Sequence, residues 1–133
     1  MVTARLRNTP SVIQVSCLLT DQVGDSVYIR AQANGFYKVA RANPADSTKM
    51  PVIGAIIRKW DFTNALVQLF GEAKVYTGLT PGKTYWVDRD SRPVLMPPEP
   101  DPGERIYTQV LGVALDVGVL LVTPDPTIIV RVG

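Results

Sequence analysis

Any catalysis by this 133-residue chain would have to proceed without histidine, because the sequence contains none. Histidine is the commonest general base and a common ligand of transition metals. Its absence excludes the Ser-His-Asp and Cys-His arrangements of nucleophilic catalysis. The one cysteine, Cys17, lies in the apolar segment Val15–Leu19. It can form neither an intramolecular disulfide nor a cysteine-based zinc site, so we expect a buried structural thiol and no dependence on an oxidising compartment.

One tripeptide, Gly82-Lys83-Thr84, matches the end of a phosphate-binding loop. The full motif needs a glycine five residues before Gly82, and Thr77 stands there instead. Pro81 also removes a backbone N–H that would bind phosphate. Pro81-Gly82 is typical of a type II turn, so we predict a turn and no nucleotide cofactor.

The acidic residues offer no better site. Asp88-Arg89-Asp90-Ser91 spaces two carboxylates as in some calcium loops, but Arg92-Pro93 follows where that motif continues with a glycine and a distal acid. We predict a solvated hairpin tip and no metal site. Paired carboxylates for glycoside hydrolysis would have to be chosen from ordinary-looking acids. The candidates are Asp25, Asp61, Glu72 and Asp116. Nothing selects them, so we predict no catalytic residue and no enzyme.

Aromatic residues could form a stacking platform for nucleic acid on an open barrel. The formal net charge is only +2, and the basic residues are scattered rather than interleaved with the rings. Core packing or a subunit interface therefore explains the aromatic residues better, and we predict no nucleic-acid partner. The aromatic residues considered are Tyr28, Phe36, Tyr37, Trp60, Phe62, Phe70, Tyr76, Tyr85, Trp86 and Tyr107.

The sequence predicts that the residues discussed above lie on β-strands and on the turns between them, almost throughout the chain. Short apolar and β-branched segments alternate with turn signals, of which Asn34-Gly35 is the strongest for a hairpin. Residues 42–51 form a polar loop, and Pro97–Gly103 holds too many prolines for a helix or a central strand. Only Trp60–Leu69 offers a helical alternative, which its alternating apolar pattern disfavours. We predict an all-β fold, a small β-barrel or β-sandwich of short, mainly antiparallel strands. The expected strands are 12–19, 27–29, 36–40, 52–57, 65–76, 84–88, 106–113, 119–123 and 127–132.

Two segments, Val52–Arg58 and Val110–Asp116, resemble each other. Each has a glycine at its third position, Gly54 and Gly112, which predicts a bulge or a close backbone approach at equivalent places. Internal duplication and chance similarity among strands both explain the match.

Residues 1–10 are predicted to form an N-terminal arm, and residues 11–133 a single β domain. The arm is polar, carries Arg5 and Arg7 and ends at Pro10; it either orders on a partner or is a frayed terminus. No apolar segment reaches the ~18 residues of a membrane span, and no signal peptide is visible, so no membrane partner is expected.

The order of several motifs resembles a β-module of tailed-bacteriophage structural proteins, found in capsid decoration (cement) proteins and in fibre proteins. The resemblance covers roughly residues 12 to 123. Its most specific parts are Gly78-Leu79-Thr80-Pro81-Gly82-Lys83-Thr84-Tyr85 and Val110-Leu111-Gly112-Val113-Ala114. The other matching segments are Val23–Tyr28, Phe36–Ala40, Asn43–Asp46, Pro51–Gly54, Val67–Gly71 and Pro97-Pro98.

This resemblance implies a virion component without a catalytic site, assembled in the host cytoplasm and located on the capsid surface. Its partners would be the major capsid protein and itself, as a homotrimer. Candidate interaction residues are Arg5, Arg7 and Pro10 in the arm, and Pro97, Pro98 and Pro100 in the proline-rich segment. A tail or fibre component is the alternative. A carbohydrate-binding module or small hydrolase is a further one, which would need aromatic side chains beside free carboxylates.

Deleting Met1–Pro10 tests the proposed arm. We expect the truncated protein to fold normally and to occupy capsids less fully than the whole chain, because we expect the arm to contact the lattice and not the core. Thermal unfolding and quantitative capsid binding measure the two effects. Undiminished occupancy would show that the arm does not bind.

Overall fold

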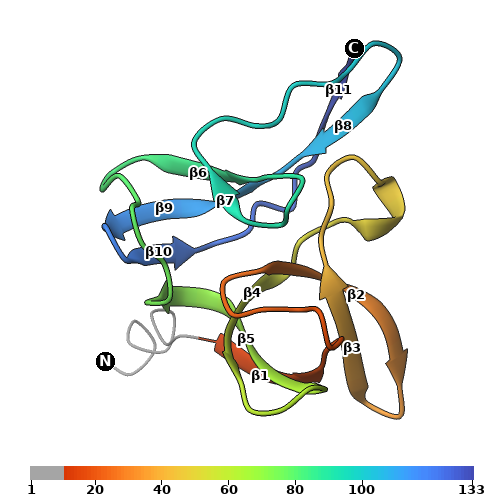
Figure 1. Cartoon of the computed structure of the whole chain (residues 1–133), viewed down its shortest axis with the longest axis vertical. Helices are drawn as coiled ribbons and strands as arrows, with labels where there is room; N and C mark the ends of the chain where they lie inside the picture. Colours follow the sequence, from red (N-terminus) through yellow and green to blue (C-terminus); the bar gives the residue numbers. More distant parts are fainter. Residues whose placement is uncertain (1–10) are drawn as a thin grey trace, which may run out of the picture.

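The computed structural model describes residues 11–133, and its all-β architecture confirms the predicted fold class. A single 3-10 turn, η1 (Ser47–Lys49), accompanies the strands in this range (Figure 1). The strands are β1 (Ser11–Ser16), β2 (Ser26–Ala33), β3 (Phe36–Arg41), β4 (Gly54–Lys59), β5 (Asn64–Ala73), β6 (Thr84–Val87), β7 (Pro93–Val94), β8 (Arg105–Thr108), β9 (Val110–Asp116), β10 (Val119–Val122) and β11 (Ile129–Val132).

Five of the strands close into a barrel in the order β1-β3-β2-β4-β5, with β5 pairing back onto β1. β1 and β3 pair in parallel, and the remaining described pairings are antiparallel. The barrel encloses a core of mostly small and β-branched side chains, which fit the interior of a small barrel. These are Val15, Cys17, Val27, Val39, Ile56, Ala65 and Val67. The predicted burial of Cys17 is confirmed, at 3% exposure.

A second layer of the sheet begins at the C-terminal end of β5. Residues Gly71–Ala73 of β5 pair with β10, and the sheet continues through β9, β6 and β7. This layer has its own core, which includes Tyr85, Leu111 and Leu120. The 10-residue strand β5 is therefore shared by both layers.

Local turn chemistry is as the sequence predicts. Asn34 and Gly35 both have positive φ, 53° and 78°, which is the type I′ geometry that joins β2 to β3. Gly82 has φ of 81°, and Lys83 N–H donates to the Thr80 carbonyl at 3.2 Å, as in a type II turn. β5 covers most of Trp60–Leu69, so the helical alternative there is excluded.

Two expectations need correction. The segment 42–51 is not wholly an exposed loop: Ala42 and Met50 lie in the second core, and the Pro44 carbonyl accepts the Tyr107 N–H at 2.8 Å. Its exposed residues are Ser47–Lys49 at η1 and Pro51.

The expected strand 106–113 is two strands, β8 and β9, which belong to different sheets. The break falls at Gln109, whose side chain is buried and bonds to main-chain atoms of two other segments. Because these main-chain partners lie far from Gln109 in the sequence, the residues around Gln109 gave no sign of the break.

Gly54 and Gly112 both lie where another strand approaches closely, as their matching positions predict. A Cβ on Gly54 would overlap the carbonyl oxygen of Gln68 in β5, and one on Gly112 would overlap that of Leu121 in β10. Both glycines thus serve close strand pairing in the two layers.

Substituting Gly54→Ala tests this packing. We expect a loss of about 3 kcal/mol in the free energy of unfolding, because the methyl group meets backbone that cannot move without breaking the β4–β5 ladder. Gly82→Ala is the matched control: nothing lies within 4 Å of its Cβ position, so only its positive φ costs stability, about 1 kcal/mol. Denaturant unfolding measures both, and equal losses would contradict the steric account.

Candidate functional site

A two-stranded ribbon, β8 with β11, projects from the body of the molecule (Figure 1). We call this ribbon together with residues 95–104 the C-terminal arm. β8 and β11 pair in antiparallel register from Ile129↔Thr108 to Val132↔Arg105. The arm is held to the body through the Tyr107–Pro44 main-chain bond and through Tyr107 itself, which packs against the second core.

The arm carries exposed apolar side chains. Ile129, Val130 and Val132 of β11 are 53%, 49% and 66% exposed, and Leu95 and Met96 are 47% and 70% exposed. β8, by contrast, buries Ile106 and Thr108. The outer strand of the ribbon therefore presents aliphatic surface to solvent.

Of the six predicted interaction residues, the structure describes Pro97, Pro98 and Pro100, and Arg5, Arg7 and Pro10 lie outside the described residues. The three prolines are half-buried, in a segment that runs beside the end of β11: Gly133 lies against the Pro100 and Asp101 carbonyls. The more exposed apolar residues, Leu95 and Met96, were missed. Their position just before the prolines was the only signal.

Ion pairs fasten the proline-rich segment. Both terminal nitrogens of Arg89 donate to the Glu104 carboxylate, each at 2.7 Å, and Arg89 also donates to the Glu99 carbonyl at 2.8 Å. Arg131 pairs with the Glu99 carboxylate at 3.1 Å. The hydrogen bond from Arg89, together with the Asp101 N–H, lowers the pKa of Glu104 to about 2. We call residues 97–104 of the arm the strap. These contacts fix the strap to Arg89 of the β6–β7 tip and to Arg131 of β11.

A buried carboxylate organises the end of the barrel. Asp25 is 1% exposed; it accepts the Gln22 N–H at 2.8 Å and pairs with Arg41 at 3.3 Å and with Arg92 at 3.2 Å. Burial raises the pKa of the Asp25 carboxyl, against the opposing effect of the Gln22 amide and the two guanidinium groups. These contacts occupy both carboxylate oxygens, so Asp25 is structural.

The predicted hairpin tip 88–91 does join β6 to β7, but it is not wholly solvated. Ser91 is 1% exposed, because its carbonyl accepts the Ser26 N–H at 2.8 Å and so docks the tip on the barrel. The Asp88 and Asp90 carboxylates accept N–H groups within the tip itself. Its acids therefore stabilise a turn.

The other candidate acids are separate. Asp61 accepts hydrogen bonds from Asn64 and Thr63, which lower its pKa, and Asp116 accepts the Val117 N–H. Glu72 is exposed on β5. Within residues 11–133 no group of three or more His, Cys, Asp or Glu side chains is placed to hold a metal ion, and no helix is long and apolar enough to cross a membrane.

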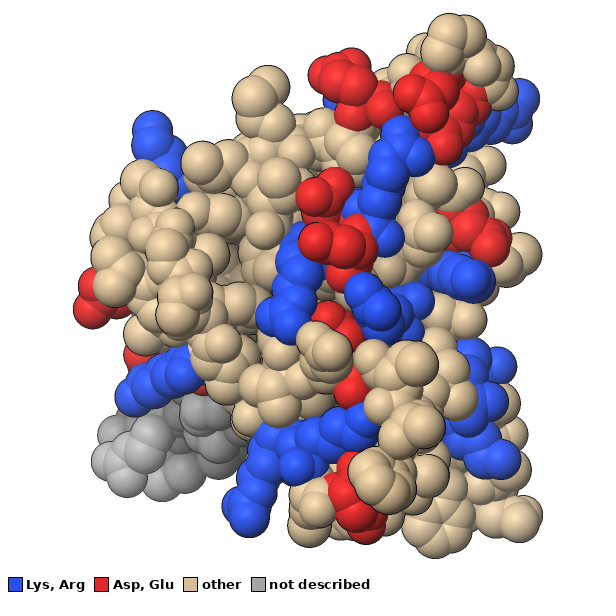
Figure 2. All heavy atoms as spheres, viewed as in Figure 1, with Lys and Arg blue, Asp and Glu red and all other residues tan. Residues whose placement is uncertain are grey.

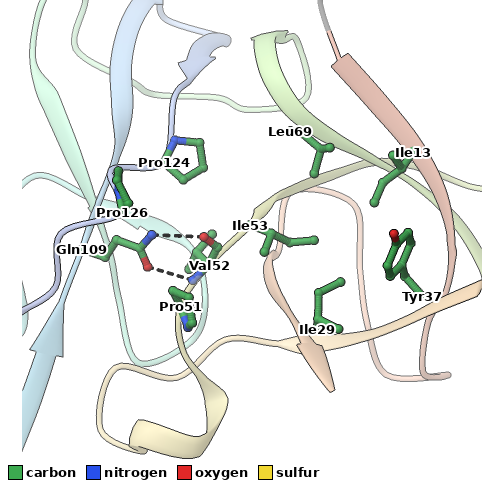
Figure 3. A pocket seen from close by; sticks show the side chains of 10 residues that line it. All are labelled: Ile13, Ile29, Tyr37, Pro51, Val52, Ile53, Leu69, Gln109, Pro124 and Pro126. Atoms are coloured by element: carbon green, nitrogen blue, oxygen red, sulfur yellow. Dashed lines mark hydrogen bonds between the residues drawn. The ribbon is translucent and has the colours of Figure 1, made fainter. Parts of the chain in front are cut away.

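An apolar groove of about 550 Å³ opens between the barrel and the second layer (Figure 3). Aliphatic side chains from the barrel line one part, and Pro51, Pro124 and Pro126 line another. Gln109 is its buried polar residue; it accepts the Val52 N–H at 2.8 Å and donates to the Val52 and Asp125 carbonyls. Because the Gln109 side-chain amide already bonds to the main chain, a ligand in this groove would be held by apolar contact and by the fit of its shape.

Exposed aromatic side chains lie in the connection between β4 and β5. Trp60 and Phe62 are 48% and 73% exposed, and the Arg58 guanidinium lies over the Trp60 ring, 5.7 Å from its centre. The neighbouring Asp61 carboxylate is occupied by its own turn. The Trp60 and Phe62 rings are thus exposed for stacking, but the Asp61 carboxylate between them is not free to bind a ligand.

No family model matches the chain, and neither the curated proteins nor the solved structures contain a match.

The Arg89–Glu104 pair makes the strap sensitive to acid. Because the folded-state pKa of Glu104 lies below the ordinary 4.5, the pair stabilises the strap above pH 4.5 and loses that contribution as the pH falls toward 2. Carboxyl NMR should show the pKa of Glu104 near 2 in the native protein and closer to its ordinary value in Arg89→Gln, where the Asp101 N–H alone still lowers it. An ordinary pKa in the native protein would contradict the bidentate pair.

Proposed function

We propose that this chain is a bacteriophage virion structural protein without enzymatic activity, a capsid decoration protein that binds the outer capsid surface and stabilises the lattice. Two lines support the proposal. One is the resemblance of its motifs to decoration and fibre modules. The other, which carries the physical argument, is the apolar outer strand of the C-terminal arm.

An isolated two-stranded ribbon is marginally stable in water, and contiguous exposed apolar residues usually indicate a surface that another protein covers. β11 pairs with β8 on one side, and no described strand pairs with its other edge. Such an edge can accept a strand of another chain, with main-chain hydrogen bonds that supply affinity. Val130 and Val132 would then become buried between chains. We assign this surface to self-association in a homotrimer.

Decoration proteins need no catalytic groups. A protein that binds the assembled lattice and not its free subunits stabilises the lattice by mass action. The interface must be large, more than about 1,000 Å² for each contact, to hold specifically. The arm together with residues 1–10 would supply separate surfaces for the neighbouring copies and for the capsid.

The alternatives predict different partners. A tail or fibre component would use the same arm against another virion protein. A carbohydrate-binding module would use the exposed rings of Trp60 and Phe62, which can stack on sugars, although the Asp61 carboxylate beside them is engaged. A polysaccharide binding screen separates this alternative, because a decoration protein should bind none.

Substituting Val132→Asp tests self-association. We expect the native chain to have a solution mass near three times 14.5 kDa, and the variant to dissociate at least about tenfold more readily, because its charge would be buried between copies. Light scattering after size-exclusion chromatography measures both. The control is Val117→Asp, in the β9–β10 turn, where Asp is well tolerated; Val117 is 57% exposed and Val132 is 66% exposed. An equal effect in both variants, or a monomeric native chain, would contradict the assignment.

A further inference from the structure

A second hollow in the molecule has a volume of about 420 Å³. Figure 2 shows Lys and Arg side chains interspersed with Asp and Glu side chains over one face of the molecule. The hollow is lined by cationic groups from four separate segments, namely Arg30, Arg41, Lys49 and Arg89. Hydroxyl and amide groups of Thr20, Tyr28 and Asn43 lie among them. We call it the basic groove.

The cations of the basic groove fall into two kinds. Arg41 and Arg89 are held in place by the Asp25 and Glu104 carboxylates. Arg30 is oriented by its bond to the Val39 carbonyl, at 3.2 Å, but it has no carboxylate partner among residues 11–133. Lys49, at the end of η1, likewise forms no ion pair within that range. Two positive charges therefore face the groove without a bound counter-charge.

The acidic side chain of the groove is Asp21, which is 2% exposed. Its Oδ2 accepts the Leu18 N–H at 2.7 Å, and its Oδ1 is buried with no hydrogen-bond partner in the described part of the chain. The Thr20 and Tyr28 hydroxyl groups in the lining can accept hydrogen bonds, so a ligand that carries N–H donors as well as negative charge suits the groove.

We propose that the basic groove binds an acidic segment of a partner protein in extended form. A peptide supplies both requirements, since its carboxylates pair with Arg and Lys and its backbone N–H groups are donors. Nucleic acid fits less well, because Tyr28 is the one aromatic residue in the lining and the chain has a net charge of only +2. The proposal rests on the proposed function only in taking the partner to be a protein.

Arg89 connects this groove to the arm, because the same guanidinium lines the groove and anchors the strap through Glu104. An acidic segment in the groove would therefore lie close to the surface assigned to self-association.

The test is fluorescence anisotropy of a labelled peptide of about six glutamates with the whole chain. We expect saturable binding that weakens as salt rises to about 0.15 M, because the contacts are ionic. Arg30→Glu/Lys49→Glu should weaken binding at least about tenfold. Lys74→Glu/Lys83→Glu, which reverses two exposed charges outside the groove, should change it less than about twofold. Thermal unfolding of each variant checks that it is folded before its binding is compared.

Three results would overturn the proposal. The first is no binding of the glutamate peptide, and the second is equal weakening by both charge reversals. The third is tighter binding of a thymidine oligonucleotide or of a heparin fragment than of the peptide. A glutamine peptide of the same length should not bind. The assay contains no capsid and does not depend on the trimer, so it can fail while the Val132→Asp result stands, and the reverse also holds.

Discussion

β5 is the strand on which the rest of the structure depends. Its first part places Ala65 and Val67 in the barrel core, and its end places Ala73 in the second core. Gly71, with φ of 120°, lies where β5 leaves its pairing with β1 and begins its pairing with β10. This conformation suits glycine and allows the strand to turn from one layer into the next. Because both cores are built on one strand, the second layer has a fixed position relative to the barrel.

The surfaces for which we propose binding roles follow from that arrangement. The second layer carries the β6–β7 tip, whose Ser91 docks on the barrel beside the Asp25 cluster. The tip in turn positions Arg89, which lines the basic groove and holds the strap of the arm. Arg89 thus links the basic groove to the proline-rich segment of the arm. A protein that works by holding others together needs this kind of rigid, two-part surface more than it needs a reactive group.

Local features of the fold were predictable and distant ones were not. Asn34-Gly35 specifies its turn within two residues, and Gly54 and Gly112 signal close strand approach by the absence of a side chain. Burial of Ser91 and Met50 depends on segments far away in the chain, and no pattern near them reports it. Apolar residues at alternate positions, such as Val130 and Val132 in β11, are expected both in a strand that packs on a core and in one that is exposed to solvent. β11 was therefore predicted as part of the strand 127–132, while its exposure required the structure.

The central claim is that this chain is a virion decoration protein. The most direct measurement is sedimentation of the purified whole chain with capsids assembled without it. The account predicts saturable binding, a fixed number of copies for each capsid, and a capsid that withstands heat better once decorated. An absence of binding to these capsids, or equal binding to unrelated capsids, would contradict it.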